Sequence, residues 1–195
     1  MKFIRTDMLP DVVMVEPDVF TDARGYFCQT WSRPAYHAAG LAETFVQDNV
    51  SRSQRGVLRG LHFQNPLPQA KLVYVLEGCV LDVAVDIRRG SPTFGRWHGV
   101  ELSAANHRQL FIPEGFAHGF CVLSESALVA YKCSQVYRPD CDAAIRWSDP
   151  EIGIEWPIRK PILSVKDESA PFLQDIMDQL PRYADNMPLA MEIKP

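Results

Sequence analysis

Short runs of β-forming residues, separated by proline and glycine, fill the first three-quarters of this chain and constrain its fold more than any other feature. The clearest run covers residues 79–87, where apolar side chains from Leu81 to Ile87 alternate with positions that include Asp82 and Asp86. A period of two places alternate side chains on opposite faces of a β-strand. Residues 71–76 precede this run and join it through Glu77-Gly78, so the two segments predict a pair of adjacent strands.

Other segments of the same kind predict further strands, at residues 12–15, 26–30, 57–63, 97–102, 109–112, 118–123 and 128–137. Helix signals are fewer. Residues 33–39 predict a short helix that Gly40 stops, and residues 171–180 predict a second helix with a proline in its first turn. Many short strands with turns between them are typical of a jelly roll. We therefore predict a mainly β protein, a jelly-roll β-sandwich or barrel with short flanking helices. We expect one domain over residues 1–183 and an arm or tail over residues 184–195.

The composition argues against several classes of function. The 195 residues carry a net charge of −4, with 47% hydrophobic and 23% charged residues and no long basic run. Such a chain has little general attraction for nucleic acid or an anionic membrane, so a phosphate group would have to be held by a few local cations. We find no signal peptide and no apolar stretch near the roughly 20 residues that span a bilayer. The 5 cysteines are odd in number and lack C-x-x-C spacing, so we expect reduced thiols in a cytoplasmic protein.

The segment Leu58-Arg-Gly-Leu-His-Phe-Gln64 places an arginine and a histidine inside an apolar strand. A histidine in this setting is most often a half-buried core residue, but Arg59 beside it needs an anionic partner. Strict alternation would put Arg59 and His62 on opposite faces of the strand. A bulge at Gly60, which lies between them, would turn both side chains the same way.

Three further segments hold residues that could take part in chemistry, although each also fits a structural role. Asp167 reads as a surface turn residue unless the fold brings it to His62, where a carboxylate would fix the imidazole tautomer. Tyr131 and Tyr137 share one face of the predicted strand at roughly 20 Å separation, so we expect that only one of them serves a given carbon atom. His118 lies between glycines and could bind an anion or a metal. No H-x-H motif with a following glutamate appears, so we expect no metal.

Taken together, a series of segments in order resembles the dTDP-4-dehydrorhamnose 3,5-epimerase family, which consists of dimeric cupin-type jelly rolls in deoxysugar synthesis. The resemblance runs from about Val15 to Pro171. The segments are residues 20–27, 45–51, 56–64, 71–73, 82–88, 91–95, 112–120, 131–132, 147–150 and 163–167.

The resemblance implies a dTDP-linked 4-keto-6-deoxyhexose as substrate, whose C4 ketone acidifies the protons on C3 and C5. It implies that His62 is the general base and that Asp167 orients it. Lys71 would stabilise the negative charge on the ketone oxygen, and Tyr131 would return a proton to the opposite face. No metal or nicotinamide cofactor is expected, because the substrate's carbonyl is the electron sink.

The resemblance also implies binding roles. Arg24 and Arg59 would contact the diphosphate, since the arginine fork suits phosphate oxygens. Gln47 and Asn49 would lie near the nucleotide and sugar, His118 at the sugar end, and Phe27 and Tyr137 would form walls. We expect a homodimer in which the N-terminal strands, through the apolar run at residues 12–15, pair across subunits.

Two departures from the family pattern bear on the pocket. The stretch between His62 and Lys71 is one residue shorter than expected, and Val136 stands where an aromatic residue is common. Three alternatives stay open: an epimerase that inverts only C3 or only C5, a metal-dependent cupin, and a sugar-nucleotide binding module without turnover.

Overall fold

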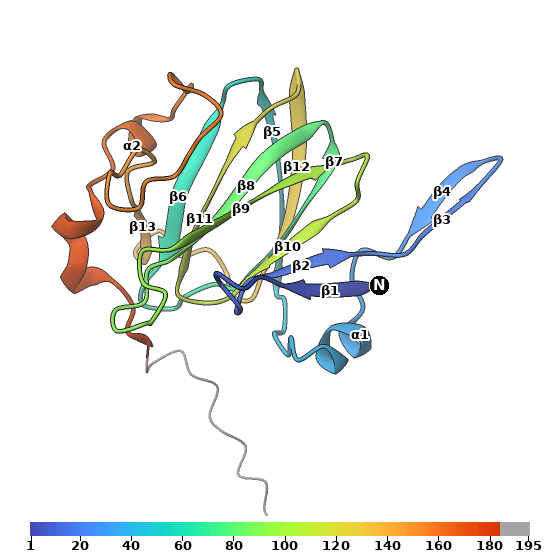
Figure 1. Cartoon of the computed structure of the whole chain (residues 1–195), viewed down its shortest axis with the longest axis horizontal. Helices are drawn as coiled ribbons and strands as arrows, with labels where there is room; N and C mark the ends of the chain where they lie inside the picture. Colours follow the sequence, from blue (N-terminus) through green and yellow to red (C-terminus); the bar gives the residue numbers. More distant parts are fainter. Residues whose placement is uncertain (184–195) are drawn as a thin grey trace, which may run out of the picture.

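Two antiparallel β-sheets form the body of the protein in a computed structural model that describes residues 1–183 (Figure 1). The predicted arm at residues 184–195 lies outside the described residues. The larger sheet has the order β1 (Lys2–Arg5), β2 (Val13–Glu16), β10 (Gln109–Ile112), β7 (Lys71–Glu77), β12 (Ser126–Cys133) and β5 (Gln47–Gln54). The smaller sheet has the order β13 (Asp142–Ala144), β6 (Leu58–Gln64), β11 (Phe116–Val122), β8 (Cys79–Asp86) and β9 (Trp97–Ser103). The predicted β-sandwich is confirmed.

An apolar core joins the two sheets. Its buried members include Val73 and Val129 of the larger sheet and Val80, Ala84 and Phe120 of the smaller one. The strand β8 is buried on both faces, because Val83 and Val85 belong to a second cluster on the outer side. The alternation seen in its sequence therefore separates two buried faces, and the acids between the apolar residues are buried as well.

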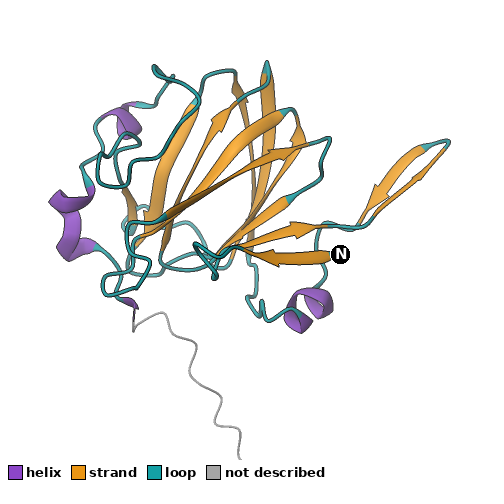
Figure 2. Ribbon diagram, in the orientation of Figure 1, coloured by secondary structure: helices purple, strands orange, loops and turns teal. Residues whose placement is uncertain are grey.

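Short helices and loops pack against part of the outer face of each sheet (Figure 2). The outer cluster against β8 is completed by Leu173 and Ile176 of the 3₁₀ helix η1 (Leu173–Gln179). The predicted helix at residues 171–180 thus forms as a 3₁₀ helix that starts two residues after Pro171. On the larger sheet, Tyr36 of α1 (Arg33–Ala38) packs over β2 and β10. This helix confirms the one predicted at residues 33–39. The remaining helix is α2 (Val165–Glu168).

Three local features bear on the predictions. The predicted strand at residues 128–137 ends at Cys133. Within the chain both edges of β2, which holds most of the run at residues 12–15, are paired, with β1 on one side and β10 on the other. Pairing of the N-terminal strands across subunits stays a prediction. A hairpin of β3 (Val19–Asp22) and β4 (Gly25–Cys28), of which only the second strand was predicted in part, projects from the body (Figure 1).

Among the residues that the structure describes, no helix is long and apolar enough to cross a membrane.

Candidate active site

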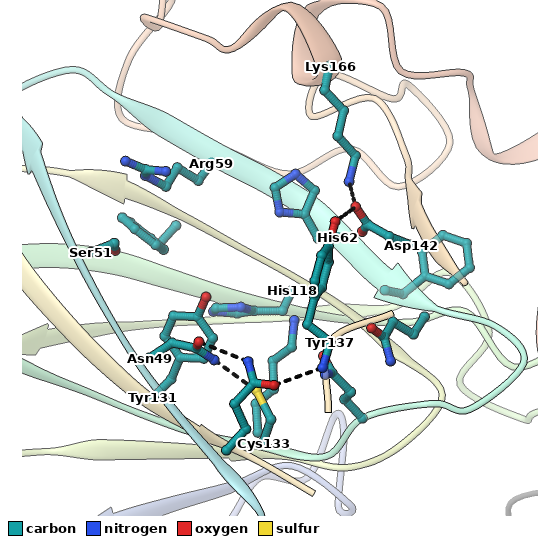
Figure 3. Close-up of a pocket in the computed structure, with 16 residues that line it drawn as sticks. Asn49, Ser51, Arg59, His62, His118, Tyr131, Cys133, Tyr137, Asp142 and Lys166 are labelled. Atoms are coloured by element: carbon teal, nitrogen blue, oxygen red, sulfur yellow. Dashed lines mark hydrogen bonds and ion pairs between the residues drawn. The ribbon is translucent and has the colours of Figure 1, made fainter. Parts of the chain in front are cut away.

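A cavity of about 370 Å³ opens between the two sheets and gathers most of the predicted site residues. The larger sheet contributes side chains from β5, β7 and β12, namely Gln47, Asn49, Ser51, Lys71, Tyr131 and Cys133. The smaller sheet contributes side chains from β6 and β11, namely Arg59, His62, Phe63, Gln64, His118 and Phe120. The two sets face one another across the cavity (Figure 3).

His62 and Asp167 form a hydrogen-bonded pair at the edge of this cavity. Their Nε2 and Oδ1 atoms lie 2.5 Å apart although the residues are 105 positions apart in the chain. Asp167 is buried, and its second oxygen accepts a hydrogen bond from the Ser164 hydroxyl at 2.8 Å. Burial alone would raise the pKa of Asp167, but the hydrogen bond and charge of His62, with help from Ser164 and Lys166, hold it below its ordinary value. An ionised Asp167 thus fixes Nε2 as the protonated nitrogen, leaving Nδ1 free to accept a proton.

The predicted bulge at Gly60 is confirmed by the strand register. His62 lies opposite His118, and Arg59 lies opposite Phe120, so β6 holds one residue more than β11 over this interval. Gly60 has a φ of +124°, and a Cβ there would lie 2.5 Å from the Cα of Gly119. Only glycine fits this conformation and this close approach. The extra residue lets Arg59 and His62 line the same cavity.

A second histidine–carboxylate pair lies deeper in the cavity. His118 Nε2 lies 2.8 Å from Oδ1 of Asp82, and both residues are buried. Burial lowers the pKa of His118, although the charge of Asp82 opposes this shift. The ring is therefore neutral near pH 7, with Nε2 donating to Asp82 and Nδ1 left as an acceptor. Asp82 was not predicted as a site residue, but an acid on an inward-facing position of a buried strand was a signal that could have identified it.

Lys71 and Tyr131 enter the cavity from the larger sheet. Burial lowers the pKa of Lys71, while the nearby Cys133, Asp82 and Asp142 act in the opposite direction. Burial raises the pKa of Tyr131, so its phenol keeps its proton at neutral pH. The cavity thus offers a lysine amine and a phenolic proton on the sheet that faces His62.

Tyr137 lines the same cavity as Tyr131. The prediction that the two tyrosines lie roughly 20 Å apart on one straight strand is therefore wrong. The strand β12 stops at Cys133, and the chain then turns so that the backbone N–H of Tyr137 donates to Gln47 Oε1 at 2.8 Å. The Tyr137 hydroxyl donates to Asp142 Oδ2 at 3.0 Å. Asp142 and Lys166, which line the same wall, were not predicted (Figure 3).

Arg24 and Phe27 lie outside this cavity. They belong to the projecting β3–β4 hairpin, where the Arg24 side chain is 89% exposed and pairs with Asp22. Phe27 is 67% exposed, with Phe20 and Tyr26 exposed beside it. Within one chain the structure therefore does not bring these two predicted binding residues to His62.

No group of three or more histidine, cysteine or acidic side chains within residues 1–183 is arranged to hold a metal ion.

Comparison with known proteins identifies the family. The sequence model described as dTDP-4-dehydrorhamnose 3,5-epimerase matches residues 6–175. The chain belongs to this family. A dTDP-4-dehydrorhamnose 3,5-epimerase from Methanothermobacter thermautotrophicus is 52% identical over 171 residues, covering 86% of this chain and 92% of the relative. One from Shigella flexneri is 54% identical over 169 residues, covering 86% of this chain and 93% of the relative.

Solved structures agree. A dTDP-6-deoxy-D-glucose-3,5-epimerase from Legionella pneumophila, in complex with dTDP-4-keto-L-rhamnose, superposes with a TM-score of 0.90 at 49% identity, covering 93% of this chain and 98% of that one. A 3'-monoepimerase from Streptomyces bikiniensis, in complex with dTDP-quinovose, gives a TM-score of 0.86 at 34% identity, covering 93% of this chain and 94% of that one.

Proposed function

We propose that this protein epimerises a dTDP-linked 4-keto-6-deoxyhexose at C3 and C5, as a step of dTDP-rhamnose-type deoxysugar synthesis. The names of its relatives and the sugar nucleotide bound to the Legionella structure support this assignment. The observation that carries it is the pairing of His62 with Asp167 on one side of a cavity that Tyr131 enters from the facing sheet. A binding module would need no base and acid opposite one another.

In this proposal His62 removes the proton next to the ketone through Nδ1, because Nε2 is held by Asp167. The electron pair of the C–H bond moves into the carbonyl, and Lys71 stabilises the negative charge that forms on the ketone oxygen. Tyr131 then donates its proton to the opposite face of the same carbon, which inverts the centre. The same groups act at both carbons, one after the other, with proton exchange with solvent between the two inversions.

We further propose that the sugar nucleotide lies along the cavity with its diphosphate toward Arg59, which the guanidinium geometry favours. Arg59 is the cation on β6, where its Nε donates to Ser53 at 3.0 Å. Gln47 and Asn49 offer side-chain amides from β5 of the facing sheet, where the Gln47 amide donates to Asn49 at 2.9 Å. His118 would contact the sugar and Tyr137 would form a wall.

The binding roles of Arg24 and Phe27 require a second subunit. We propose a homodimer in which the β3–β4 hairpin of one chain reaches the cavity of its partner. The exposed aromatic side chains of the hairpin support this arrangement, because monomeric surfaces rarely present such clusters. We also propose that residues 1–183 act as one domain in the cytoplasm, where the five free cysteines are in keeping with a reducing compartment.

The proposed activity predicts solvent exchange at two carbons. Incubation with dTDP-4-dehydro-6-deoxyglucose in D₂O should introduce deuterium at both C3 and C5, measured by NMR, because each centre passes through an enolate. Label at C3 alone or C5 alone would indicate a mono-epimerase. The C3-only outcome is worth testing because a Streptomyces 3'-monoepimerase shares this fold at 34% identity. Tight binding with no label at either carbon would show a sugar-nucleotide binding module.

Substitution of the two tyrosines separates the acid from the base. Tyr131→Phe should still exchange substrate hydrogen with solvent from the His62 side but should form little inverted product, because the phenolic proton is gone. Tyr137→Phe, the matched control, should lose less inversion, because that hydroxyl already donates to Asp142. NMR can score exchange and inversion separately on one substrate. If Tyr137→Phe blocks inversion while Tyr131→Phe turns over normally, the acid is Tyr137.

Subunit mixing tests the proposed dimer. Light scattering at micromolar concentration should give twice the chain mass of 22.1 kDa. Arg24→Ala and His62→Ala should each be impaired alone, and an exchanged 1:1 mixture should recover up to about a quarter of wild-type activity, because half of the dimers would hold one intact site. A monomer, or a mixture with no more activity than its components, would contradict a hairpin shared between subunits.

A further inference from the structure

A single carboxylate, that of Asp142, ties together three parts of the cavity wall. Its Oδ2 atom accepts hydrogen bonds from Lys166 Nζ at 2.5 Å and from the Tyr137 hydroxyl at 3.0 Å (Figure 3). Asp142 begins the short edge strand β13, which pairs with β6 so that Asp142 lies opposite Gln64 and Ala144 lies opposite His62. The carboxylate is thus fixed to the strand that carries the proposed base.

Lys166 connects this carboxylate to the residue that orients His62. It is the neighbour of Asp167 in α2, a helix of only 4 residues. Such a short helix has little stability of its own, so its position depends on the contacts around it. Ser164 caps it by accepting from the backbone N–H of Asp167 at 3.1 Å. The Lys166–Asp142 ion pair is a second contact of α2 with the cavity wall, beside the Asp167–His62 hydrogen bond. The side chains of the ion pair are 43% and 18% exposed.

Tyr137 extends the same network to the cavity floor. Its backbone N–H donates to Gln47, the Gln47 amide donates to Asn49, and the Asn49 amide lies 3.6 Å from Cys133 Sγ. The dashed contacts in Figure 3 follow this path from Lys166 to Cys133. Displacement of the Asp142 carboxylate would therefore remove one tie from α2 and one from Tyr137 at the same time, and leave α2 held by the Asp167–His62 bond and Tyr137 by its backbone N–H.

We propose that Asp142 is a positioning residue, which acts through Lys166 to hold Asp167 against His62 and directly on Tyr137 to hold the wall of the cavity. Asp142 is not proposed to exchange a proton with substrate. The inference rests on the proposed function, since it concerns the geometry of the proposed base. A misplacement of about 1 Å in a reacting group can cost about 10²-fold in rate, so the loss of this tie should appear in kcat.

The ion pair also lies among the charges that act on Lys71. Lys71 is influenced by charged and titratable groups on four neighbouring elements, Cys133 on β12, Asp82 on β8, Asp142 on β13 and Lys166 on α2, and it in turn influences His118 on β11. Among them Asp142 raises the pKa of Lys71 and Lys166 lowers it, in opposition to each other. In the proposed mechanism kcat falls at alkaline pH when Lys71 loses its proton. Removal of Asp142 or Lys166 should therefore shift this alkaline limb of the kcat–pH profile, and the two single variants should shift it in opposite directions.

The test compares Asp142→Asn, Lys166→Met and the double variant with wild type in the D₂O assay. Asp142→Asn and Lys166→Met should each lower kcat about 10- to 100-fold while KM and the Kd for dTDP change less than about threefold. The alkaline limb of kcat should move to lower pH in Asp142→Asn, to higher pH in Lys166→Met, and back toward the wild-type position in the double variant. Asp140→Asn is the matched control, because Asp140 lies two residues away in an exposed pair with Arg138.

Three results would overturn the proposal. These are wild-type kcat in both single variants, a loss confined to KM or to dTDP affinity, or alkaline limbs that do not move in opposite directions. A loss of dTDP affinity in Lys166→Met would show that Lys166 binds phosphate instead. If Asp142→Asn does not fold, Lys166→Met carries the test, since that side chain is partly exposed on α2. Absence of exchange by the wild-type protein would reject the proposed function, whereas normal turnover by the variants would reject only the role of Asp142.

Discussion

The inward faces of the two sheets impose the main constraint on this molecule. Every second side chain of a strand in a sandwich points toward the facing sheet, where it must be apolar or find a polar partner. Val73, Val80 and Val129 meet this condition as an apolar core. Elsewhere between the sheets polar side chains such as Asn49 and His62 face inward, and they line a cavity. These polar side chains hydrogen-bond to one another only in part, so they keep donors and acceptors that a polar ligand can use.

The same arrangement supports an inversion mechanism. A sugar ring held between the sheets would expose one face to His62 on β6 and the other to Tyr131 on β12. The proposed base is held by Asp167 from outside the sandwich, through a helix that is itself tied to Asp142. The rigid strands thus carry the groups that would touch substrate, while short irregular segments orient them.

The sequence was informative wherever a pattern had a direct physical cause. Apolar alternation identified β8, a short β-forming run identified β10, and a glycine between Arg59 and His62 signalled the bulge that brings both into one cavity. The strand β5 was missed because its sequence, QDNVSRSQ, is almost entirely polar. Its inward-facing residues line the cavity and not the core. They are therefore polar, and the apolar pattern by which strands are recognised is missing.

Other features depended on tertiary structure that no local pattern records. The position of Tyr137 follows from a turn after Cys133, so an argument from a straight strand failed. Asp142 and Lys166 gain their significance only when β13 pairs with β6 and α2 lies beside it. The pairing of Asp167 with His62 was suggested by the resemblance, and the structure supplies the contact that spacing alone could not establish.

The central claim is that His62 removes the protons on both carbons next to the ketone. It is tested most directly by measuring deuterium incorporation at C3 and C5 with His62→Ala, alongside the Kd for dTDP. The account predicts that exchange at both positions falls by about 10²- to 10⁴-fold, while dTDP affinity stays within a few fold of wild type. Exchange near the wild-type rate at either carbon would contradict it, because another group would then be the base.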